Sequence, residues 1–358
     1  MKSNPPEMFS DPFEERSAVK LHRNVHALGA QVRFESNSEE LLRLVDSAYA
    51  GLPRHRLLRV QPRLRIRLVL TSAERKRTSS EPAPLRLLSG AGLLAGTMEP
   101  SSFVVVSPHE QGALVVVSPR MLRFPYHIRY ELIEFAVFTL AARAQGLVAM
   151  HGACVGRAGN GILLLGPSGA GKSTVTLQCL IEGLGILAED SVFVAPDTLL
   201  ATGVSNFLHV REDSLRWITE RRTLVKIRRS PVIRRRSGVR KYEVDLRGGE
   251  YPLAERPLKL GAIVFLSARS AAGQPLLRRL PQKEALAMLV QEQAYEANRP
   301  PWASFVRRVK RLPFFELRRG HHPRESVAAL REFLDSASIE PGDRDVPRID
   351  AKSRRHAL

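Results

Sequence analysis

The 358-residue sequence predicts an α/β protein in which a smaller α+β unit precedes a domain built around a strand, a glycine-rich loop and a helix. Two observations favour this class. The first third of the chain combines strand-like runs at 63–70, 103–108 and 114–119 with one helical pattern. Further along, the aliphatic run 162–165 leads into a glycine-rich loop and then a second helical pattern, an order typical of α/β domains.

The N-terminal elements follow from local periodicity. Ser36 and Glu39 have the spacing of a capping box, which predicts a helix with apolar residues recurring through 41–48. Residues 63–70 alternate Arg with Leu or Ile, as in a half-buried strand, and the two valine-rich runs predict a hairpin. We therefore assign residues 1–122 to an N-terminal α+β domain, which contains no motif with recognisable chemistry.

The second domain is assigned to residues 123–335. A helical pattern at 126–144 ends at Gly146, and a last helix is expected near 325–334. Strands are expected at 147–155, 161–165, 184–188, 191–194, 242–246 and 261–267. The loop expected at 71–84 and the polar tail at 336–358 lack any apolar pattern, and the tail is expected to be disordered.

Charge and cysteine content indicate which partners and which cellular compartment to expect. Lys and Arg number 55 against 36 Asp and Glu, a net charge of +19, which attracts polyanions but also fits an arginine-rich proteome. Cys154 and Cys179 lack partners at disulfide-scaffold or zinc-ligand spacing and suit a reducing cytoplasm. The N-terminus has no signal-peptide pattern and the longest apolar run, 132–142, is too short to span a bilayer, so a cytoplasmic location is expected.

The glycine-rich loop satisfies the pattern Gly-x-x-x-x-Gly-Lys-Ser/Thr. It consists of Gly166, Pro167, Ser168, Gly169, Ala170, Gly171, Lys172, Ser173 and Thr174. Its glycines let successive backbone N–H groups turn inward as an anion nest. Lys172 would lie near the β- and γ-phosphates, the Ser173 hydroxyl can bind Mg²⁺, and the following helix adds its positive end. The sequence therefore predicts a site for a nucleoside triphosphate.

An acidic pair, Glu189 and Asp190, ends the strand expected after this loop. A carboxylate there can hold Mg²⁺ or accept the proton of an incoming hydroxyl, two tasks that phosphoryl transfer requires. The alternative is that the pair merely begins a turn. The chain lacks the Asn-Lys-x-Asp motif of GTPases and the Leu-Ser-Gly-Gly-Gln signature of ABC transporters, so neither class is favoured.

Three segments in this order resemble the HPr serine kinase/phosphorylase family, and more closely its relatives that accompany peptide-modification gene clusters. They are Met150-His151-Gly152-Ala153, the loop, and Ala188-Glu189-Asp190-Ser191. The resemblance covers about residues 149–194 and extends more weakly to about residue 335. It implies a P-loop kinase domain with a mixed sheet. It also implies transfer of the γ-phosphoryl group of ATP, with Mg²⁺, to a serine or other hydroxyl of a protein or peptide.

The resemblance also suggests roles for the acidic pair and the histidine. Glu189 matches the family's catalytic carboxylate, Asp190 its neighbour, and His151 the histidine near the transferring phosphate. The family has Asp at the first position, so either Glu189 acts as the base or Asp190 has taken over. Asp190 is expected to be indispensable, as base or, with Ser173, as a metal ligand. The alternative for His151 is a core residue, the commoner role of a single His on a strand.

One segment of the family is missing. A Leu-Glu-x-Arg-Gly-x-Gly segment, linked to phosphorolysis, should follow the acidic pair, whereas the nearest run, 242–249, has the wrong order and distance. The chain is therefore expected to act in the kinase direction only, and HPr itself is not favoured as the substrate.

Residues 221–241 contain ten Lys or Arg in 21. They are expected to form a mobile loop that clamps triphosphate or an acidic peptide, a nucleic-acid-binding segment, or a solvated loop. Only Tyr242 adjoins them as an aromatic residue, so no base-stacking platform is expected. The alternatives to a protein or peptide kinase are a nucleotide-dependent regulatory or nucleic-acid-binding protein and a small-molecule kinase. The acceptor, the oligomeric state (a homo-oligomer included) and the role of the N-terminal domain stay open.

Overall fold

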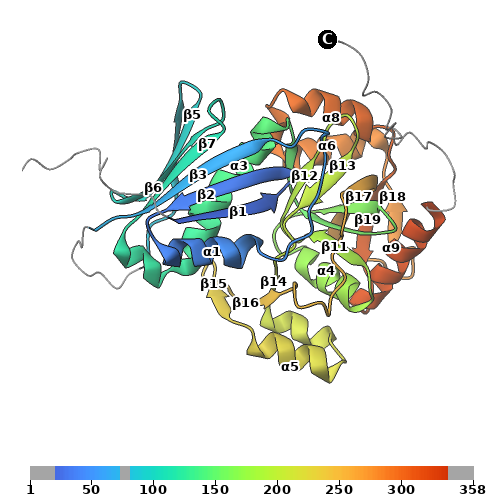
Figure 1. Cartoon of the computed structure of the whole chain (residues 1–358). Coiled ribbons are helices and arrows are strands. Elements are labelled where there is room, and N and C mark those ends of the chain that lie inside the picture. Colours follow the sequence, from blue (N-terminus) through green and yellow to red (C-terminus); the bar gives the residue numbers. More distant parts are fainter. Residues whose placement is uncertain (1–20, 73–80, 338–358) are drawn as a thin grey trace, which may run out of the picture.

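The computed structural model describes residues 21–72 and 81–337, in which the strands form sheets of seven, nine and three strands (Figure 1). A mixed α/β architecture is therefore confirmed. The polar tail, beyond residue 337, and most of the loop expected at 71–84 lie outside the described residues. No helix of the described ranges is long and apolar enough to cross a membrane.

The N-terminal sheet has the strand order β1-β2-β3-β7-β6-β5-β4. Its strands are β1 (Leu21–Ala27), β2 (Ala30–Ser36), β3 (Arg63–Leu70), β4 (Arg86–Gly90), β5 (Leu93–Glu99), β6 (Ser102–Ser107) and β7 (Gly112–Val117). β3 runs parallel to β2 and β7, and the other pairs are antiparallel. The strand expected at 63–70 and the valine-rich hairpin, formed by β6 and β7, are thus confirmed.

Two helical segments share one hydrophobic core with this sheet. They are α1 (Glu39–Tyr49) and a continuous segment made of α2 (Pro125–His127), the π-helical η2 (Ile128–Ile133) and α3 (Glu134–Ala144), which the short 3-10 turn η1 (Pro119–Arg123) precedes. The helix assigned from sequence to the second domain therefore packs on the N-terminal sheet. The division of the chain at residue 122 stays a prediction.

The expected cap of α1 is shifted by two residues. Ser38 is the N-cap and its side chain accepts a hydrogen bond from the Leu41 N–H, whereas Ser36 Oγ accepts one from the Ser38 N–H. The capping box from Ser36 to Glu39 was therefore wrong. Ser36 ends strand β2, so its backbone is already committed to the sheet.

The nine-stranded sheet carries the glycine-rich loop and has the main order β11-β9-β10-β17-β13-β12-β8, with β19 beside β17 and β18 beside β19. Its strands are β8 (Val148–His151), β9 (Ala153–Arg157), β10 (Asn160–Leu165), β11 (Gly185–Ala188), β12 (Ser191–Val194), β13 (Leu200–Gly203), β17 (Leu258–Ser270), β18 (Leu277–Arg279) and β19 (Phe314–Arg319). β17 runs parallel to β10 and β19, and the remaining pairs are antiparallel. The sheet is mixed, as expected.

Helices pack into two separate cores with this sheet. α4 (Lys172–Ile181) and α9 (Pro323–Ala337) contribute to one core, and α6 (Gln282–Glu292) and α8 (Pro301–Val309), which flank the short α7 (Ala294–Ala297), contribute to the other. Cys154 and Cys179 are buried free thiols in these cores.

The strand expected at 147–155 is two strands that break at Gly152. A Cβ at this position would lie 2.7 Å from the Leu164 carbonyl oxygen, so only glycine fits. Because of the break, β8 pairs with β12 while β9 pairs with β10 and β11. His151 thereby lies opposite Ser191 in the β8–β12 pair, next to the acidic pair.

The basic segment 221–241 is folded, contrary to the loop that we expected. It forms α5 (Arg221–Arg229), which projects from the body in Figure 1, and a hairpin of β15 (Val232–Arg234) and β16 (Arg240–Asp245). β14 (Phe207–Val210), which the short η3 (Glu212–Trp217) follows, completes the three-stranded sheet. The expectation failed because a few buried apolar residues, chiefly Ile227 and Ile233, anchor the segment despite its charge.

Candidate functional site

The glycine-rich loop connects the carboxyl end of β10 to the N-terminus of α4. Gly166, Gly169 and Gly171 have φ of +141°, +84° and +104°, conformations that residues with a Cβ rarely adopt. Lys172 begins the helix, and its ammonium donates to the carbonyl oxygens of Gly166 and Pro167. The segment thus has the strand–loop–helix context that triphosphate-binding loops require, and nucleotide binding itself stays a prediction.

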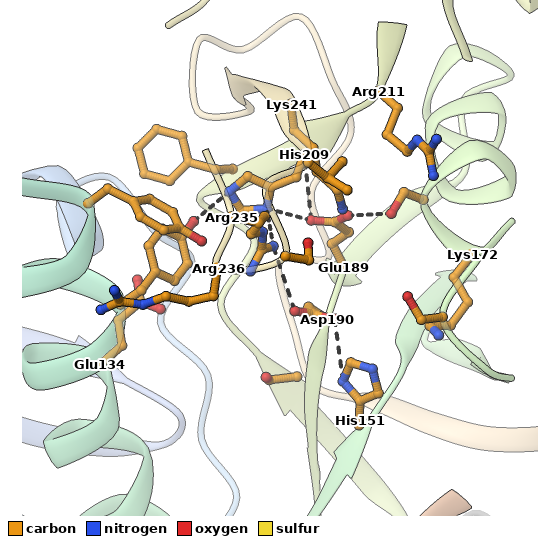
Figure 2. A pocket seen from close by; sticks show the side chains of 18 of the residues that line it. Glu134, His151, Lys172, Glu189, Asp190, His209, Arg211, Arg235, Arg236 and Lys241 are labelled. Atoms are coloured by element: carbon orange, nitrogen blue, oxygen red, sulfur yellow. Dashed lines mark hydrogen bonds and ion pairs between the residues drawn. The ribbon is translucent and has the colours of Figure 1, made fainter. Parts of the chain in front are cut away.

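A cavity of about 770 Å³ opens beside this loop. Figure 2 shows side chains that come from the loop, from the ends of β8 and β11, from β14, from the β15–β16 hairpin and from the helical segment behind the N-terminal sheet. The sequence-predicted residues Ser168, Gly169, Gly171, Lys172, Ser173, Thr174, His151, Glu189 and Asp190 line it together. Six separate parts of the chain therefore meet in one pocket, which is within the size range of ligand sites.

Glu189 is buried at the base of the loop. Its carboxylate accepts hydrogen bonds from Ser173 Oγ at 2.7 Å and from His209, through Nδ1 at 2.8 Å and the backbone N–H at 3.2 Å. Burial by itself would raise the pKa of this carboxyl, but the charge and hydrogen bond of His209, the charge of Lys241 and the Ser173 hydrogen bond outweigh it. The net effect lowers the pKa of Glu189 to about 2, so it is an anion at neutral pH.

Asp190 faces the pocket. Its side chain is 47% exposed, with Oδ1 3.4 Å from His151 Nδ1 and Oδ2 3.9 Å from Arg235 Nη2. The His151 side chain is 59% exposed, so the alternative of a core histidine was wrong. Two hydrogen bonds fix the backbone of His151: the side chain of the buried Gln293 accepts one from the His151 N–H at 2.9 Å and donates one to the His151 carbonyl oxygen at 3.1 Å. The adjacent carboxylates of Glu189 and Asp190 therefore differ in burial: Glu189 is buried, whereas Asp190 is exposed to the pocket.

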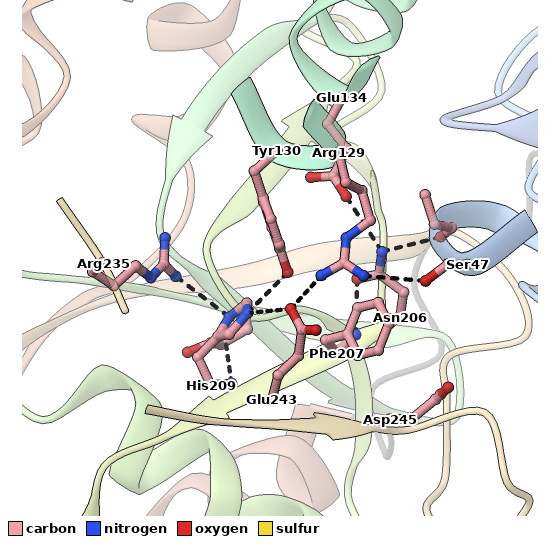
Figure 3. A network of polar contacts seen from close by, with 12 residues as sticks. Ser47, Arg129, Tyr130, Glu134, Asn206, Phe207, His209, Arg235, Glu243 and Asp245 are labelled. Carbon is pink, nitrogen blue, oxygen red and sulfur yellow. Dashed lines mark hydrogen bonds and ion pairs between the residues drawn. The ribbon is translucent and has the colours of Figure 1, made fainter. Parts of the chain in front are cut away.

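A chain of buried and half-buried polar side chains extends behind Glu189 (Figure 3). Tyr130 Oη lies 2.8 Å and Glu243 Oε1 3.4 Å from His209 Nε2, and Arg129 donates to Glu243. Arg129 also donates to Ser47 in α1, at 3.1 Å. The network therefore links the glycine-rich loop, through Ser173 and Glu189, to helix α1.

His209 lies between two of these carboxylates, which favour its protonated form. Burial alone would lower the pKa of His209, but the charge of Glu189 and its hydrogen bonds to Glu189 and Glu243 raise the pKa above its usual value. With Nδ1 and Nε2 both protonated, the ring can donate to carboxylates on its two sides.

Basic side chains surround the rest of the pocket. Lys172, Arg211, Arg235 and Lys241 all line it, and burial lowers the pKa of Lys241. In Figure 2 these groups lie around Glu189 and Asp190. Such a concentration of cations is suited to a polyanion such as a triphosphate.

Sequence reasoning missed several residues of the site. His209, Glu243, Arg129 and Tyr130 belong to no recognised motif, and no local signal marks them. Arg235 and Lys241 belong to the basic segment, one of whose expected roles was to clamp a triphosphate, but the sequence does not indicate which of its side chains line the pocket.

Comparisons with known proteins add little. No protein-family model matches the chain, and no curated protein is similar in sequence. The solved structure of the Hpr(Ser) kinase/phosphatase from Coxiella burnetii overlaps 53% of this chain and 92% of its own, at 10% identity and a TM-score of 0.28. A similarity of that size carries no argument about activity.

The oxygen donors of the site suit Mg²⁺. Ser173 Oγ, Glu189 and Asp190 supply a hydroxyl and carboxylates beside the glycine-rich loop, and Mg²⁺ characteristically combines one or two carboxylates with phosphate oxygens and water. No group of three or more His, Cys, Asp or Glu that could hold a metal unaided occurs in the described ranges 21–72 and 81–337. These oxygen donors therefore fit Mg²⁺ only together with further ligands, such as phosphate oxygens or water.

Proposed function

We propose that this chain is a P-loop phosphotransferase, and more particularly a kinase that transfers the γ-phosphoryl group of ATP to a hydroxyl. The observation that carries the proposal is that two adjacent carboxylates have different surroundings, each suited to a different task. Glu189 is buried and bound to the loop through Ser173, while Asp190 is exposed to the same pocket. Phosphoryl transfer uses one carboxylate to hold the metal site at the phosphates and another to accept the proton of the attacking hydroxyl.

In the proposed reaction the loop and its cations hold the triphosphate. Backbone N–H groups, Lys172 and the end of α4 would stabilise the phosphate charge. The acceptor oxygen forms a bond to the γ-phosphorus as the bond from that phosphorus to the β–γ bridging oxygen breaks, and ADP leaves. Asp190 takes the proton of the acceptor hydroxyl, and His151 holds the carboxylate in place.

Mg²⁺ would be held by Ser173, with Glu189 beside it. When bound, the metal neutralises charge on the β- and γ-phosphates. The ionised Glu189 fixes the direction of the Ser173 hydroxyl, and His209 keeps Glu189 in position. The sequence also allows Asp190 to act as a metal ligand. The variant Asp190→Asn distinguishes the two roles, because loss of a metal ligand would weaken Mg²⁺-dependent binding of ATP, whereas loss of the base would slow transfer.

We further propose that the acceptor is a serine or other hydroxyl of a protein or peptide and that the chain acts in the kinase direction only. Support for the direction is the missing Leu-Glu-x-Arg-Gly-x-Gly segment. Support for an acceptor site is that the pocket continues past Asp190, away from the loop.

The test is transfer of label from γ-labelled ATP, with Mg²⁺, to hydroxyl-bearing peptides and proteins. We expect labelled product with the unmodified chain, none with Lys172→Ala, and full transfer with Lys283→Ala, an exposed lysine of α6 outside the pocket. A chain that labels no hydroxyl but binds RNA tightly and salt-sensitively would contradict the kinase and favour the nucleic-acid-binding alternative.

A further inference from the structure

One wall of the pocket is formed by aromatic side chains of the α2–α3 segment. Tyr126, Tyr130, Phe135 and Phe138 all line the cavity and are half-buried. The same segment packs into the core of the seven-stranded sheet, and Phe135 and Phe138 also contact that core, so the N-terminal sheet supports the wall. The rings of Tyr126 and Tyr130 lie 4.6 Å apart, between centroids. We call these four residues the aromatic wall.

A guanidinium group covers part of the aromatic wall. The centre of the Arg235 guanidinium lies 5.9 Å from the ring centroids of both Tyr126 and Tyr130. Its Nε is buried and has no hydrogen-bond partner among the described residues. The neighbouring Arg236 is bound by Glu131 through two contacts of 2.8 Å. The two rings and the guanidinium together present a flat, partly apolar surface to the cavity, against which another ring or flat apolar group can pack.

Glu134 lies beside the aromatic wall and lines the same cavity. It is 5% exposed, and the side-chain amide of Asn206 donates to it at 3.5 Å. Burial raises the pKa of Glu134 to about 7, so much of it is uncharged near neutral pH. A carboxyl in that state does not oppose an apolar neighbour as an anion would.

The aromatic wall lies on the acceptor side of the pocket. In loops of this type the lysine contacts the β- and γ-phosphates, so the γ-phosphoryl group would lie between Lys172 and Asp190. Figure 2 shows Lys172 and Glu134 on opposite sides of the pocket with Asp190 between them. A hydroxyl in contact with Asp190 would therefore carry its remaining atoms toward the aromatic wall.

We infer that the aromatic wall and Arg235 form a subsite for an aromatic or large apolar group that the acceptor carries next to its hydroxyl. The inference rests on the proposed function, because it assigns the acceptor side of the same site. Two sources share this chemistry: a side chain next to a serine in a peptide, and a small hydroxy compound with a ring. The subsite gives the N-terminal domain a role in acceptor selection.

Two matched pairs of acceptors test the subsite. One pair is serine peptides that differ only in having Phe or Gly on both sides of the serine, and the other is phenylserine and threonine, which differ in a ring and a methyl group. We expect kcat/KM to favour the ring-bearing member of at least one pair by about tenfold or more, the gain from burying a ring. The pair that shows the preference identifies the source. Equal values in both pairs would overturn the inference.

A variant that fills the cavity beside the aromatic wall provides the structural control. Thr139 lines the pocket on α3, whereas Arg143, one turn further, is exposed and outside it. Thr139→Trp should reduce the ring preference to less than about threefold, and Arg143→Trp should retain it. If Thr139→Trp instead weakens binding of ATP but not of inorganic triphosphate, the wall holds the nucleotide base and the inference is wrong.

Binding measurements separate the subsite from the kinase activity. The two peptides are titrated by calorimetry into the Lys172→Ala chain, with and without Thr139→Trp. Tighter binding of the Phe peptide that Thr139→Trp removes, together with no transfer by the unmodified chain, would support the subsite and contradict the proposed kinase. Transfer without ring preference, and equal binding of the two peptides, would leave the kinase and remove the subsite.

Discussion

The substitution His209→Gln tests the buried network that holds Glu189. The side chain of His209 is 4% exposed and lies between the carboxylates of Glu189 and Glu243, which are 6% and 8% exposed. Gln has a similar polar character and can donate to one carboxylate, but it carries no charge. The variant therefore leaves two buried carboxylates without the imidazole that lies between them.

The expected cost is large because the partner is removed from a buried ion pair. Breaking such a pair typically costs about 3–5 kcal/mol, since the remaining charge stays buried. The pKa of Glu189 gives the same order: the difference between 4.5 and about 2 corresponds to on the order of 3 kcal/mol of stability from its interactions. We expect the free energy of unfolding to fall by about 3 kcal/mol.

The assay is urea unfolding followed by tryptophan fluorescence. Trp217 and Trp302, the chain's two tryptophans, lie in η3 and α8, so the signal reports the domain that contains the site. His109→Gln is the matched control, because His109 also pairs with a carboxylate, Glu110, but its side chain is 94% exposed. It should cause no measurable change.

The pH dependence supplies a second readout. The lowered pKa of Glu189 contributes stability that is fully present above pH 4.5 and is lost as the pH falls toward 2. His209 has a raised pKa, so its contribution is fully present below pH 6.5 and is lost as the pH rises through its folded pKa. His209→Gln should therefore lose stability at a less acidic pH than the unmodified chain. A variant as stable as the His109→Gln control across this range would refute the reasoning.

Two further predictions concern Glu134 and Gly152. The raised pKa of Glu134 contributes stability that is present below pH 4.5 and is lost as the pH rises through about 7. Urea unfolding of the unmodified chain should therefore show a loss of stability between about pH 5 and 8, and Glu134→Gln should remove part of that loss. An equal loss of stability in the variant would contradict the raised pKa of Glu134. Gly152→Ala should cost about 1–3 kcal/mol in thermal unfolding, because its Cβ would meet the Leu164 carbonyl at 2.7 Å. Gly90→Ala, with no atom within 4 Å of the added Cβ, is the control, and equal melting temperatures would refute the strain.

The sequence was most informative where structure depends on neighbours along the chain. Alternation in β3, the paired valine runs of β6 and β7, and the passage from β10 through the loop into α4 were all predictable, because each pattern lies within one or two elements. The sequence showed an acidic pair after the loop, but it did not indicate that Glu189 contacts Ser173.

Contacts between distant segments were not predictable. His209 meets Glu189 only because β14 belongs to a separate small sheet, and Arg129 reaches Glu243 across 114 positions of the chain. The basic segment was misjudged for a related reason. Its charge indicated a loop, whereas two buried isoleucines, set by tertiary packing, fold it into a helix and a hairpin.

The most direct test of the proposed mechanism compares Asp190→Asn with Asp213→Asn, an exposed aspartate outside the pocket. Transfer of γ-labelled phosphate to a peptide hydroxyl is measured beside the affinity for ATP with Mg²⁺. As the proton acceptor, Asp190 should contribute about 10²–10⁴-fold to transfer and little to affinity, so Asp190→Asn should lose transfer by that factor while ATP binding stays within about threefold. A variant that transfers at the rate of Asp213→Asn, or one whose loss lies in Mg²⁺-dependent ATP binding, would contradict the assignment of Asp190 as the base.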